Sequence, residues 1–272
     1  MQNRFYILMG LTCLILGCRI DNTTTYSHAG YYFRCLNNNS VSFYGWTDKA
    51  IKKSEGKMRI PEKIYNFDVV EVNCKAMPKR DEITEIVVPS TVKTIRESSF
   101  INYRNLNKIV LPEGLTSIEK EAFKECDSLR EITLPDSLKV IPVDAFSGSG
   151  LSNVYLPKKL KTIYGGAFEF CYGLNNISLP DTLEEIFPYA FYDTSLNTIT
   201  LPASLNFVGE YVFMKCKNLR SVKFQDTSNW YIKKRGDATW IPIDVSDPAK
   251  NAENFTADYN NRYAGYIWVK KR

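Results

Sequence analysis

Apolar side chains recur along the middle of the chain with a nearly constant spacing. Six prolines are separated by 23, 23, 22, 23 and 22 residues, each is followed eleven residues later by a phenylalanine, and a leucine closes each unit. A period of this length is typical of a solenoid, whose coils bury their apolar side chains against one another. The markers are Pro89, Pro112, Pro135, Pro157, Pro180 and Pro202; Phe100, Phe123, Phe146, Phe168, Phe191 and Phe213; and Leu106, Leu129, Leu151, Leu174, Leu196 and Leu219.

Each unit predicts a short strand followed by a return path. Apolar and polar residues alternate in Ile132-Thr133-Leu134, as in a strand with one buried face. Pro135 ends this strand because it has no amide hydrogen for the next rung of the ladder. Leu138 and Ile141 turn the chain back over the interior, where Phe146 joins the stack. Coils stacked about 4.8 Å apart would close the core, so we expect a β-rich solenoid with parallel strands.

The flanks of the repeats predict caps. Alternating apolar residues between Tyr31 and Ser54 indicate a hairpin over the first coil. Asp247-Pro248 is a good helix start, with Ala249, Ala252, Phe255 and Tyr259 on one face, and a strand follows from Tyr263 to Val269. We expect Trp230, Trp240 and Trp268 to seal the open end rather than form a ligand pocket. The predicted organisation is a signal peptide at 1–17, a tether at 18–30, an N-terminal β cap at 31–58, the repeat array at 59–225 and a C-terminal helix and strand cap at 226–272.

Cysteines occupy the loop between phenylalanine and leucine in three units, at Cys126, Cys171 and Cys216. Equivalent positions two coils apart should be about 10 Å distant, too far for a disulfide and unsuited to a converging zinc site. We therefore expect buried thiols that fill the interior. For Cys35 and Cys74 in the N-terminal flank, pairing and free thiols both remain open.

The phrase Leu-Pro-x-x-Leu-x-x-Ile-x-x-x-Ala-Phe-x-x-Cys-x-x-Leu, at 111–129 and 156–174, resembles the leucine-rich repeat of the BspA type. Residues 59–61, 67–72 and 76–77 are similar to the degenerate first repeat of such arrays. Ser99 and Val212 depart from the alanine of the phrase, and Gln225 stands where a seventh proline would be. The resemblance implies a curved stack of parallel strands. It also implies a non-enzymatic bacterial protein, surface-bound or secreted, that binds host matrix proteins or other bacteria.

The first residues resemble a bacterial lipoprotein signal. An apolar run of twelve residues, Phe5 to Leu16, follows Arg4 and precedes Gly17-Cys18. Twelve residues are too few to span a bilayer, which needs about twenty. We therefore expect export, lipidation of Cys18 and a place on the cell surface. Secretion with cleavage nearby, or an uncleaved short anchor, are the alternatives.

The charge of the chain is uneven. The net charge is +5, but the residues from Met214 onward carry twelve Lys or Arg against six Asp or Glu, so the preceding part is close to neutral. This basic end could meet acidic glycans or anionic lipid headgroups, although a run such as Lys233-Lys234-Arg235 is more often a solvated loop.

Catalytic chemistry is poorly supported by the sequence. His28 is the single histidine, which excludes histidine-based triads and multi-histidine metal sites. Among the predicted outward strand positions only Glu131 is acidic, so no pair of carboxylates forms. No Gly-rich loop, zinc spacing or basic helix indicates nucleic-acid binding. We expect no enzyme activity, no cofactor, no metal and no nucleic-acid partner.

Two surfaces are candidates for binding, and a structural spacer role is a third possibility. The first is a neutral row on the outward strand positions that would bind a host matrix or bacterial surface protein: Asn153, Tyr155, Asn176, Ser178, Thr198 and Thr200. These residues also suit any exposed strand. The second surface is a set of aromatics, expected to be exposed on the opposite flank, that could stack on glycans: Tyr164, Phe187, Tyr189 and Tyr192.

Overall fold

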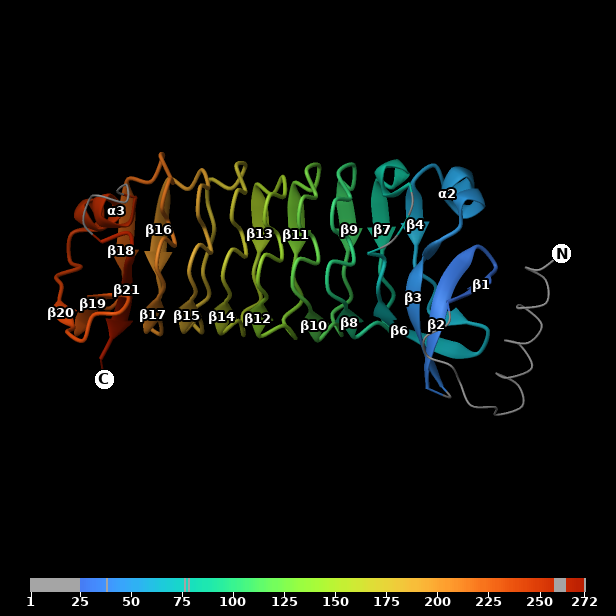
Figure 1. The fold of residues 1–272 in the computed structure, drawn as a ribbon, viewed down its shortest axis with the longest axis horizontal. Helices are drawn as coiled ribbons and strands as arrows, with labels where there is room; N and C mark the ends of the chain where they lie inside the picture. The colour runs from blue at the N-terminus through green and yellow to red at the C-terminus, as the bar shows by residue number, and fades with distance from the viewer. Residues whose placement is uncertain (1–24, 38, 76, 78, 257–262, 272) are drawn as a thin grey trace.

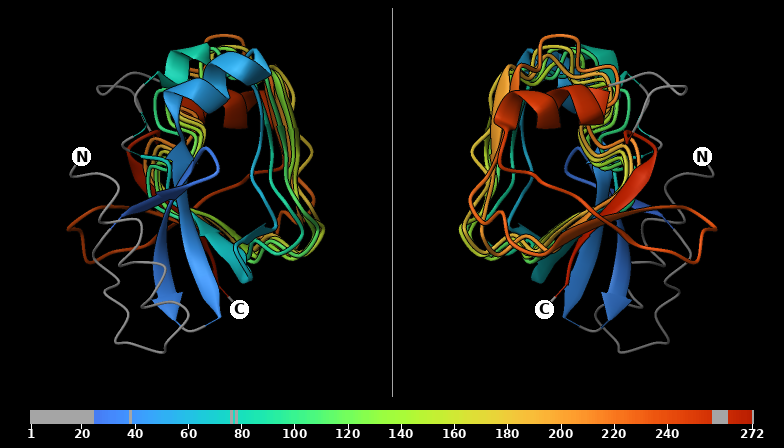
Figure 2. Two further views of the ribbon diagram at one scale, coloured as in Figure 1. Left: turned by 90° about the vertical axis from the view of Figure 1, so that its right-hand side faces the viewer. Right: turned by 90° about the vertical axis from the view of Figure 1, so that its left-hand side faces the viewer.

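A computed structural model describes residues 25–37, 39–75, 77, 79–256 and 263–271. It is a row of stacked coils between two caps, and the described ends of the chain lie at opposite ends of the row (Figure 1). The predicted solenoid of 22–23-residue coils with parallel strands is confirmed. The expected curvature is wrong, because the coils stand in a nearly straight row and almost superimpose when viewed end-on (Figure 2).

One side of the row carries the strands that the repeat pattern predicted. They pair in parallel as β4-β7-β9, β11-β13 and β16-β18. The coil at 176–178 has no assigned strand, consistent with the low strand preference of Asn175 and Asn176. Along this side lie β4 (Lys57–Arg59), β7 (Glu85–Val87), β9 (Lys108–Val110), β11 (Glu131–Thr133), β13 (Asn153–Tyr155), β16 (Thr198–Leu201) and β18 (Ser221–Phe224).

A second row of short parallel strands forms where the chain turns back after each proline. The inward residue of each coil, such as Ile141 or Ile163, is fully buried. Register pairs Ile141 with Ile163 and Ile163 with Ile186, so equivalent residues of successive coils lie side by side. The strands are β6 (Phe67–Val72), β8 (Thr94–Ile95), β10 (Ser117–Ile118), β12 (Val140–Ile141), β14 (Thr162–Ile163), β15 (Glu185–Ile186) and β17 (Phe207–Val208).

The phenylalanines form one continuous stack through the interior. Neighbouring ring centroids are 5.4 to 5.6 Å apart, and the ring planes lie within 20° of each other. Each ring is fully buried. The amide of Phe146 donates to the carbonyl of Ala167 in the next coil at 2.9 Å, and Phe168 donates to Ala190 at 2.8 Å. Backbone hydrogen bonds and aromatic contacts therefore join the same pairs of coils.

The N-terminal cap is built on an antiparallel hairpin, as the alternation predicted. β3 pairs with β6 in parallel, so the hairpin extends the second row of strands. β1 lies within the segment expected to be a tether, and His28 stacks on Tyr65 at 4.0 Å, so the folded part begins before residue 31. The elements of this cap are β1 (Tyr26–His28), β2 (Tyr31–Asn37), β3 (Ser40–Trp46), α2 (Asp48–Ser54), β5 (Lys63–Ile64) and η1 (Arg80–Glu82).

The C-terminal cap extends the same row from the other end. β21 (Tyr266–Lys270) pairs with β17 and with β19 (Trp230–Lys234), which pairs with β20 (Ile241–Pro242). α3 (Pro248–Thr256) begins as predicted, with Asp247 Oδ1 accepting from the amides of Ala249 and Lys250 at 2.9 and 3.1 Å.

Two expectations for this cap are wrong, and a third is not tested. Ala249 is exposed, whereas Asn251, Ala252, Asn254 and Phe255 are the buried residues of the helix. Trp230 and Trp268 seal the end, but Trp240 is only half-buried and lies outside the core. Tyr259 lies outside the described residues.

The three loop cysteines are buried free thiols, as predicted. Each Sγ donates to the carbonyl of the phenylalanine in the preceding coil: Cys126 to Phe100 at 3.2 Å, Cys171 to Phe146 at 3.1 Å and Cys216 to Phe191 at 3.0 Å. Cys35 and Cys74 are also buried and free, so they do not form the disulfide that the sequence left open.

Candidate binding face

The outward positions of β9, β11, β13, the coil at 176–178, β16 and β18 share one surface, which we call the strand face. The structure brings the predicted neutral row together on it. Val154, Ile177 and Ile199 point inward with 9, 6 and 3% exposure. The residues on either side of them are all exposed: Asn153, Tyr155, Asn176, Ser178, Thr198 and Thr200.

Most polar groups of this row have no partner within the described protein. The side chains of Tyr155, Asn176, Ser178, Thr198 and Thr200 make no hydrogen bond, ion pair or ring contact with any residue that the structure describes. Asn153 Nδ2 makes one weak contact, with Ser152 Oγ at 3.4 Å. A ligand could therefore replace the water that is hydrogen-bonded to these groups, and no hydrogen bond within the protein would have to break.

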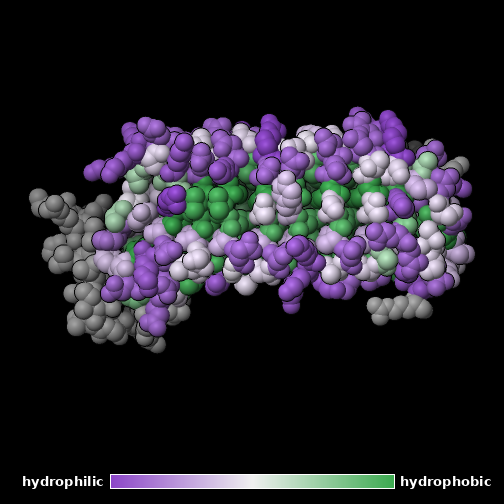
Figure 3. Space-filling view, turned by 180° about the vertical axis from the view of Figure 1, so that it is seen from behind, coloured by the Kyte–Doolittle hydropathy of each residue, from purple (hydrophilic) through white to green (hydrophobic). Residues whose placement is uncertain are grey.

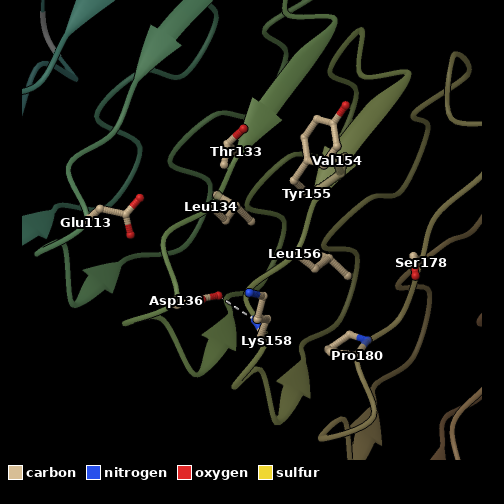
Figure 4. Close-up of a pocket in the computed structure, with 10 residues that line it drawn as sticks. All are labelled: Glu113, Thr133, Leu134, Asp136, Val154, Tyr155, Leu156, Lys158, Ser178 and Pro180. Carbon is tan, nitrogen blue, oxygen red and sulfur yellow. Dashed lines mark hydrogen bonds between the residues drawn. The ribbon is translucent and has the colours of Figure 1, made fainter.

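The strand face is hollowed beside this row. A shallow depression of about 460 Å³ is lined by Leu134, Val154, Tyr155, Leu156 and Ser178, among others. A second, of about 480 Å³, lies over β9 and β11 and shares Glu113 and Thr133 with the first. Figure 4 shows Thr133 and Tyr155 on adjacent strands, with Asp136 and Lys158 in the turns that follow them.

An apolar band runs along the middle of the strand face, with polar side chains above and below it (Figure 3). Val110 is 44% exposed and Tyr155 is 55% exposed, and Leu111, Leu156 and Leu179 are half-buried. The sequence reasoning missed this band because it treated the leucine before each proline as core. The available signal was Val110, the one aliphatic side chain among the outward strand positions from β9 to β18.

Charge is sparse along the strand face. Lys108, Glu131 and Lys223 are exposed on its strands and form no ion pair with a described residue. Glu131 pairs in register with Asn153, and Lys223 with Thr200, so the neutral row lies between isolated charges. The neutral row therefore suits a ligand that presents apolar groups and uncharged hydrogen-bonding groups.

The aromatic flank is arranged differently from the strand face. Tyr164 and Phe187 stack at 5.1 Å with 27° between their planes, and Phe187 contacts Phe207 at 5.2 Å. Tyr164 is 37% exposed and Tyr189 is 36% exposed. The expected exposure of Tyr192 is wrong: it is 7% exposed, because it packs on Phe170 at 5.6 Å and beneath the Lys215 ammonium at 5.2 Å.

The buried cysteines are poorly suited to reaction or metal binding. Burial raises the pKa of the Cys171 thiol to about 12 and that of Cys216 to about 11, so both stay protonated at neutral pH. Protonated thiols are weak nucleophiles and weak metal ligands. Within the described ranges, no three His, Cys, Asp or Glu side chains are placed to hold a metal ion.

Cys18, the expected lipidation site, lies outside the described residues. No helix in the described part of the chain is long and apolar enough to cross a membrane.

Several solved structures share this fold. The chain is similar to a leucine rich cell surface protein of Faecalibacterium prausnitzii A2-165, with 23% identity, a TM-score of 0.67 and coverage of 82% of this chain and 62% of that chain. It thus spans less than two thirds of that relative. It is also similar to a leucine-rich repeat protein of T. pallidum, with 26% identity, a TM-score of 0.60 and coverage of 72% and 91%.

A leucine-rich repeat protein of Bacteroides ovatus ATCC 8483 matches with 22% identity and a TM-score of 0.50, covering 74% of this chain and 71% of that chain. No curated protein matches the sequence. The profile described as BspA type leucine rich repeat region matches residues 70–171 and 139–235, which together exceed half of the chain. The six phenylalanine-centred units and the solenoid that they build are the repeats that this profile describes. The chain therefore belongs to the BspA type leucine-rich repeat family.

Proposed function

We propose that this chain is a non-enzymatic cell-surface protein whose strand face binds a partner protein. The observation that carries the proposal is the pair of adjoining depressions, with an apolar floor at Leu134 and Leu156. Their rim combines uncharged groups, such as Tyr155 and Ser178, with the charged side chains of Glu113, Asp136 and Lys158. Proteins with this repeat are generally bacterial surface proteins with a protein-binding role and no enzymatic one.

The shape of the strand face favours a polypeptide ligand over a small molecule. Small-molecule sites are concave and bury most of their ligand, whereas these depressions are shallow and adjoin along the row of coils. An extended segment lying across successive coils would repeat the same contact at each one. Many modest contacts around a few aromatic or aliphatic anchors are typical of protein interfaces. Tyr155 and Val110, the most exposed large side chains of the band, would be the anchors.

The proposed partner is a host extracellular matrix protein or a protein on another bacterial cell. Family membership and the resemblance in fold to a surface protein support this assignment. In the same proposal residues 1–17 are a signal peptide, Cys18 carries lipid, and the segment up to β1 is a tether that holds the repeats at the membrane. The array at 59–225 then presents the strand face, and the flanking caps close its ends.

The geometry supports glycan capture by the aromatic flank less well. A sugar stacks on the open face of an aromatic ring, but Tyr164 and Phe187 turn their faces toward each other at 5.1 Å. Tyr192 is buried, and the faces of Tyr189 and Tyr211 are stacked on each other at 5.2 Å. Glycan binding and a spacer role are therefore the alternatives that the experiment must distinguish from protein binding.

The test uses a fragment of residues 25–272, which contains every element that the structure describes. A fragment beginning at residue 29 would lose β1 and the stacking of His28 on Tyr65. The fragment is measured against immobilised fibronectin, fibrinogen and a glycan array. Saturable binding to a protein with no glycan signal supports the proposal. Binding to glycans alone overturns it, and a folded fragment that binds none of them favours the spacer role.

A further inference from the structure

We propose that a second surface, the hairpin at the C-terminal end, rests on a membrane that carries anionic headgroups. This hairpin spans residues 229–244 and includes β19, β20 and the turn between them; together with Lys271 we call it the basic hairpin. The inference is independent of the strand face and of lipid at Cys18.

Three lysines of the basic hairpin lack acidic partners. Lys233, Lys234 and Lys271 form no ion pair with any carboxylate in the part of the chain that the structure describes. Aromatic rings hold two of them: the Lys271 ammonium lies 4.4 Å from the ring centroid of Tyr231 and 5.6 Å from that of Trp240, and Lys233 lies 5.0 Å from Trp240. Cation–π contacts orient these ammonium groups without neutralising their charge.

The neighbouring carboxylates are mostly engaged elsewhere. Asp226 accepts from Lys270, and Asp244 accepts from the amide of Ser246 at 2.9 Å. Glu210 lies 4.0 Å from Arg235, whose side chain is 85% exposed and hence weakly paired. Asp237 is the remaining exposed acid of the hairpin. Positive charge therefore exceeds negative charge on this surface, in line with the surplus of Lys and Arg after Met214.

Exposed apolar groups beside these cations favour a bilayer over an acidic polymer. Trp240 is half-buried and contacts Lys233 and Lys271. The two residues that follow it are both exposed, Ile241 at 48% and Pro242, and they pair in register with Ile232 and Tyr231 of β19. Tryptophan prefers the depth of the headgroups, and lysine is attracted to anionic lipid. An aliphatic side chain gains by entering the acyl boundary, whereas a sulfated or phosphorylated polymer offers it little to bury against.

The placement of the basic hairpin is compatible with binding by the strand face. Both end-on views in Figure 2 show the orange hairpin projecting beyond the outline of the coils, on the side away from β16 and β18. The N-terminal strands β1 and β2, in blue, project on the same side. A membrane that touches the basic hairpin would therefore leave the strand face directed away from the lipid.

Trp240 provides a local probe for this contact. The other three tryptophans, Trp46, Trp230 and Trp268, are 1, 3 and 0% exposed. A blue shift of tryptophan emission on adding vesicles, and quenching by lipids brominated on their acyl chains, would therefore report on Trp240. The 25–272 fragment is mixed with vesicles of pure phosphatidylcholine, or of phosphatidylcholine with 30% phosphatidylglycerol.

We expect binding to the anionic vesicles and not to the neutral ones, and weaker binding as salt rises. One basic residue near an anionic surface contributes roughly fivefold in affinity, so Lys233→Glu with Lys271→Glu should lower binding at least tenfold. The control is Lys49→Glu with Lys53→Glu on α2, at the other end of the row, where both lysines are exposed and form no ion pair with a described residue. Circular dichroism checks that all variants fold.

Three results would overturn the inference: no binding to anionic vesicles, equal binding by the two double variants, or binding without quenching by brominated lipid. The same fragment is also tested on heparin as a soluble acidic polymer. Binding to heparin in the absence of vesicle binding would assign the surface to an acidic polymer instead.

Discussion

The rings of Phe146 and Phe168 stack with their centroids 5.4 Å apart and their planes within 8° of each other. The two residues are 22 positions apart in the chain and occupy the same place in neighbouring coils. Each phenylalanine is therefore covered by the coils on both sides. In such a stack the stability of one coil depends on its neighbours, and a cavity at the centre weakens two interfaces at once.

Removing one ring from the centre of this stack should be costly. Phe168→Ala deletes a fully buried aromatic side chain and should lower the free energy of unfolding by about 3–5 kcal/mol in urea denaturation. The matched control is Tyr172→Ala, whose side chain is 64% exposed and should cost less than about 1 kcal/mol. Equal losses would show that the core register is misassigned.

Tyr192→Ala tests whether the Tyr192 side chain is buried, as in the structure, or exposed, as the sequence suggested. An exposed loop residue would lose little on truncation, but Tyr192 is 7% exposed and packs against Phe170 and Tyr189. We therefore expect a loss above about 2 kcal/mol in the same denaturation experiment. If Tyr192→Ala lowers the free energy of unfolding no more than Tyr172→Ala does, Tyr192 is exposed as the sequence suggested.

The buried thiols should make the fold sensitive to high pH. Burial raises the pKa of Cys171 from its ordinary value of 9.0 to about 12. Between these values the unfolded chain releases the thiol proton and the folded chain keeps it, so the free energy of unfolding falls as pH rises. One thiol contributes a slope of up to about 1.4 kcal/mol per pH unit. Cys171→Ala should show a shallower decline between pH 9 and 11 than wild type, and parallel curves would exclude this role.

Asn251 should hold the C-terminal cap on the last coil. Its Nδ2 donates to the carbonyls of Val222 and Val245 at 3.0 and 2.9 Å, and its side chain is buried. Asn251→Ala leaves both buried acceptors without this donor and should cost about 1–3 kcal/mol. Asn218→Ala is the control, since Asn218 is exposed and makes no side-chain hydrogen bond with a described residue. A melting temperature unchanged by Asn251→Ala would mean that the cap docks by apolar contacts alone.

The repeat pattern predicted the core well because the same physical constraint recurs in every coil. Pro135 and Phe146 have equivalents in five other units, so the end of the strand and the aromatic stack are each indicated six times. Cys126 fills its loop, and Cys171 and Cys216 take the same place in two other units. The flanks have no such copies. Ala249 looked like the buried side of a helix, but the helix instead buries Asn251, which satisfies carbonyls at the edge of the solenoid.

The candidate binding face was predicted only in part. Alternation placed Asn153 and Thr200 outward correctly, because strand periodicity decides which face a residue occupies. The apolar band was missed because the exposure of the Leu156 side chain depends on how adjacent coils pack, which alternation along one strand does not reveal. Tyr192 was misplaced for a similar reason: its burial comes from Phe170 and Lys215, which contact it only in the folded chain.

Lipid attachment at Cys18 makes a separate prediction. The mature protein should partition into the detergent phase of a Triton X-114 extract, and Cys18→Ala should move it to the aqueous phase. Metabolic labelling with a fatty acid provides the matching measurement. A Cys18→Ala protein that stays in the detergent phase, or a wild-type protein without label, would count against the lipid anchor.

Binding by the strand face is the central claim. The strand-face variant is Asn176→Arg with Thr198→Glu, which places two charges in the neutral row. The control is Tyr164→Ala with Phe187→Ala, which alters the aromatic flank and leaves the strand face intact.

The decisive measurement is the affinity of the 25–272 fragment and both variants for the matrix protein that wild type binds, by biolayer interferometry. The introduced Arg and Glu lie on adjacent coils and can pair with each other, but they fill the row with bulk and with charge that an interface must desolvate. The strand-face variant should therefore bind at least tenfold more weakly while the control binds like wild type. Wild-type affinity in the folded strand-face variant, together with loss of binding in the aromatic-flank control, would contradict the account.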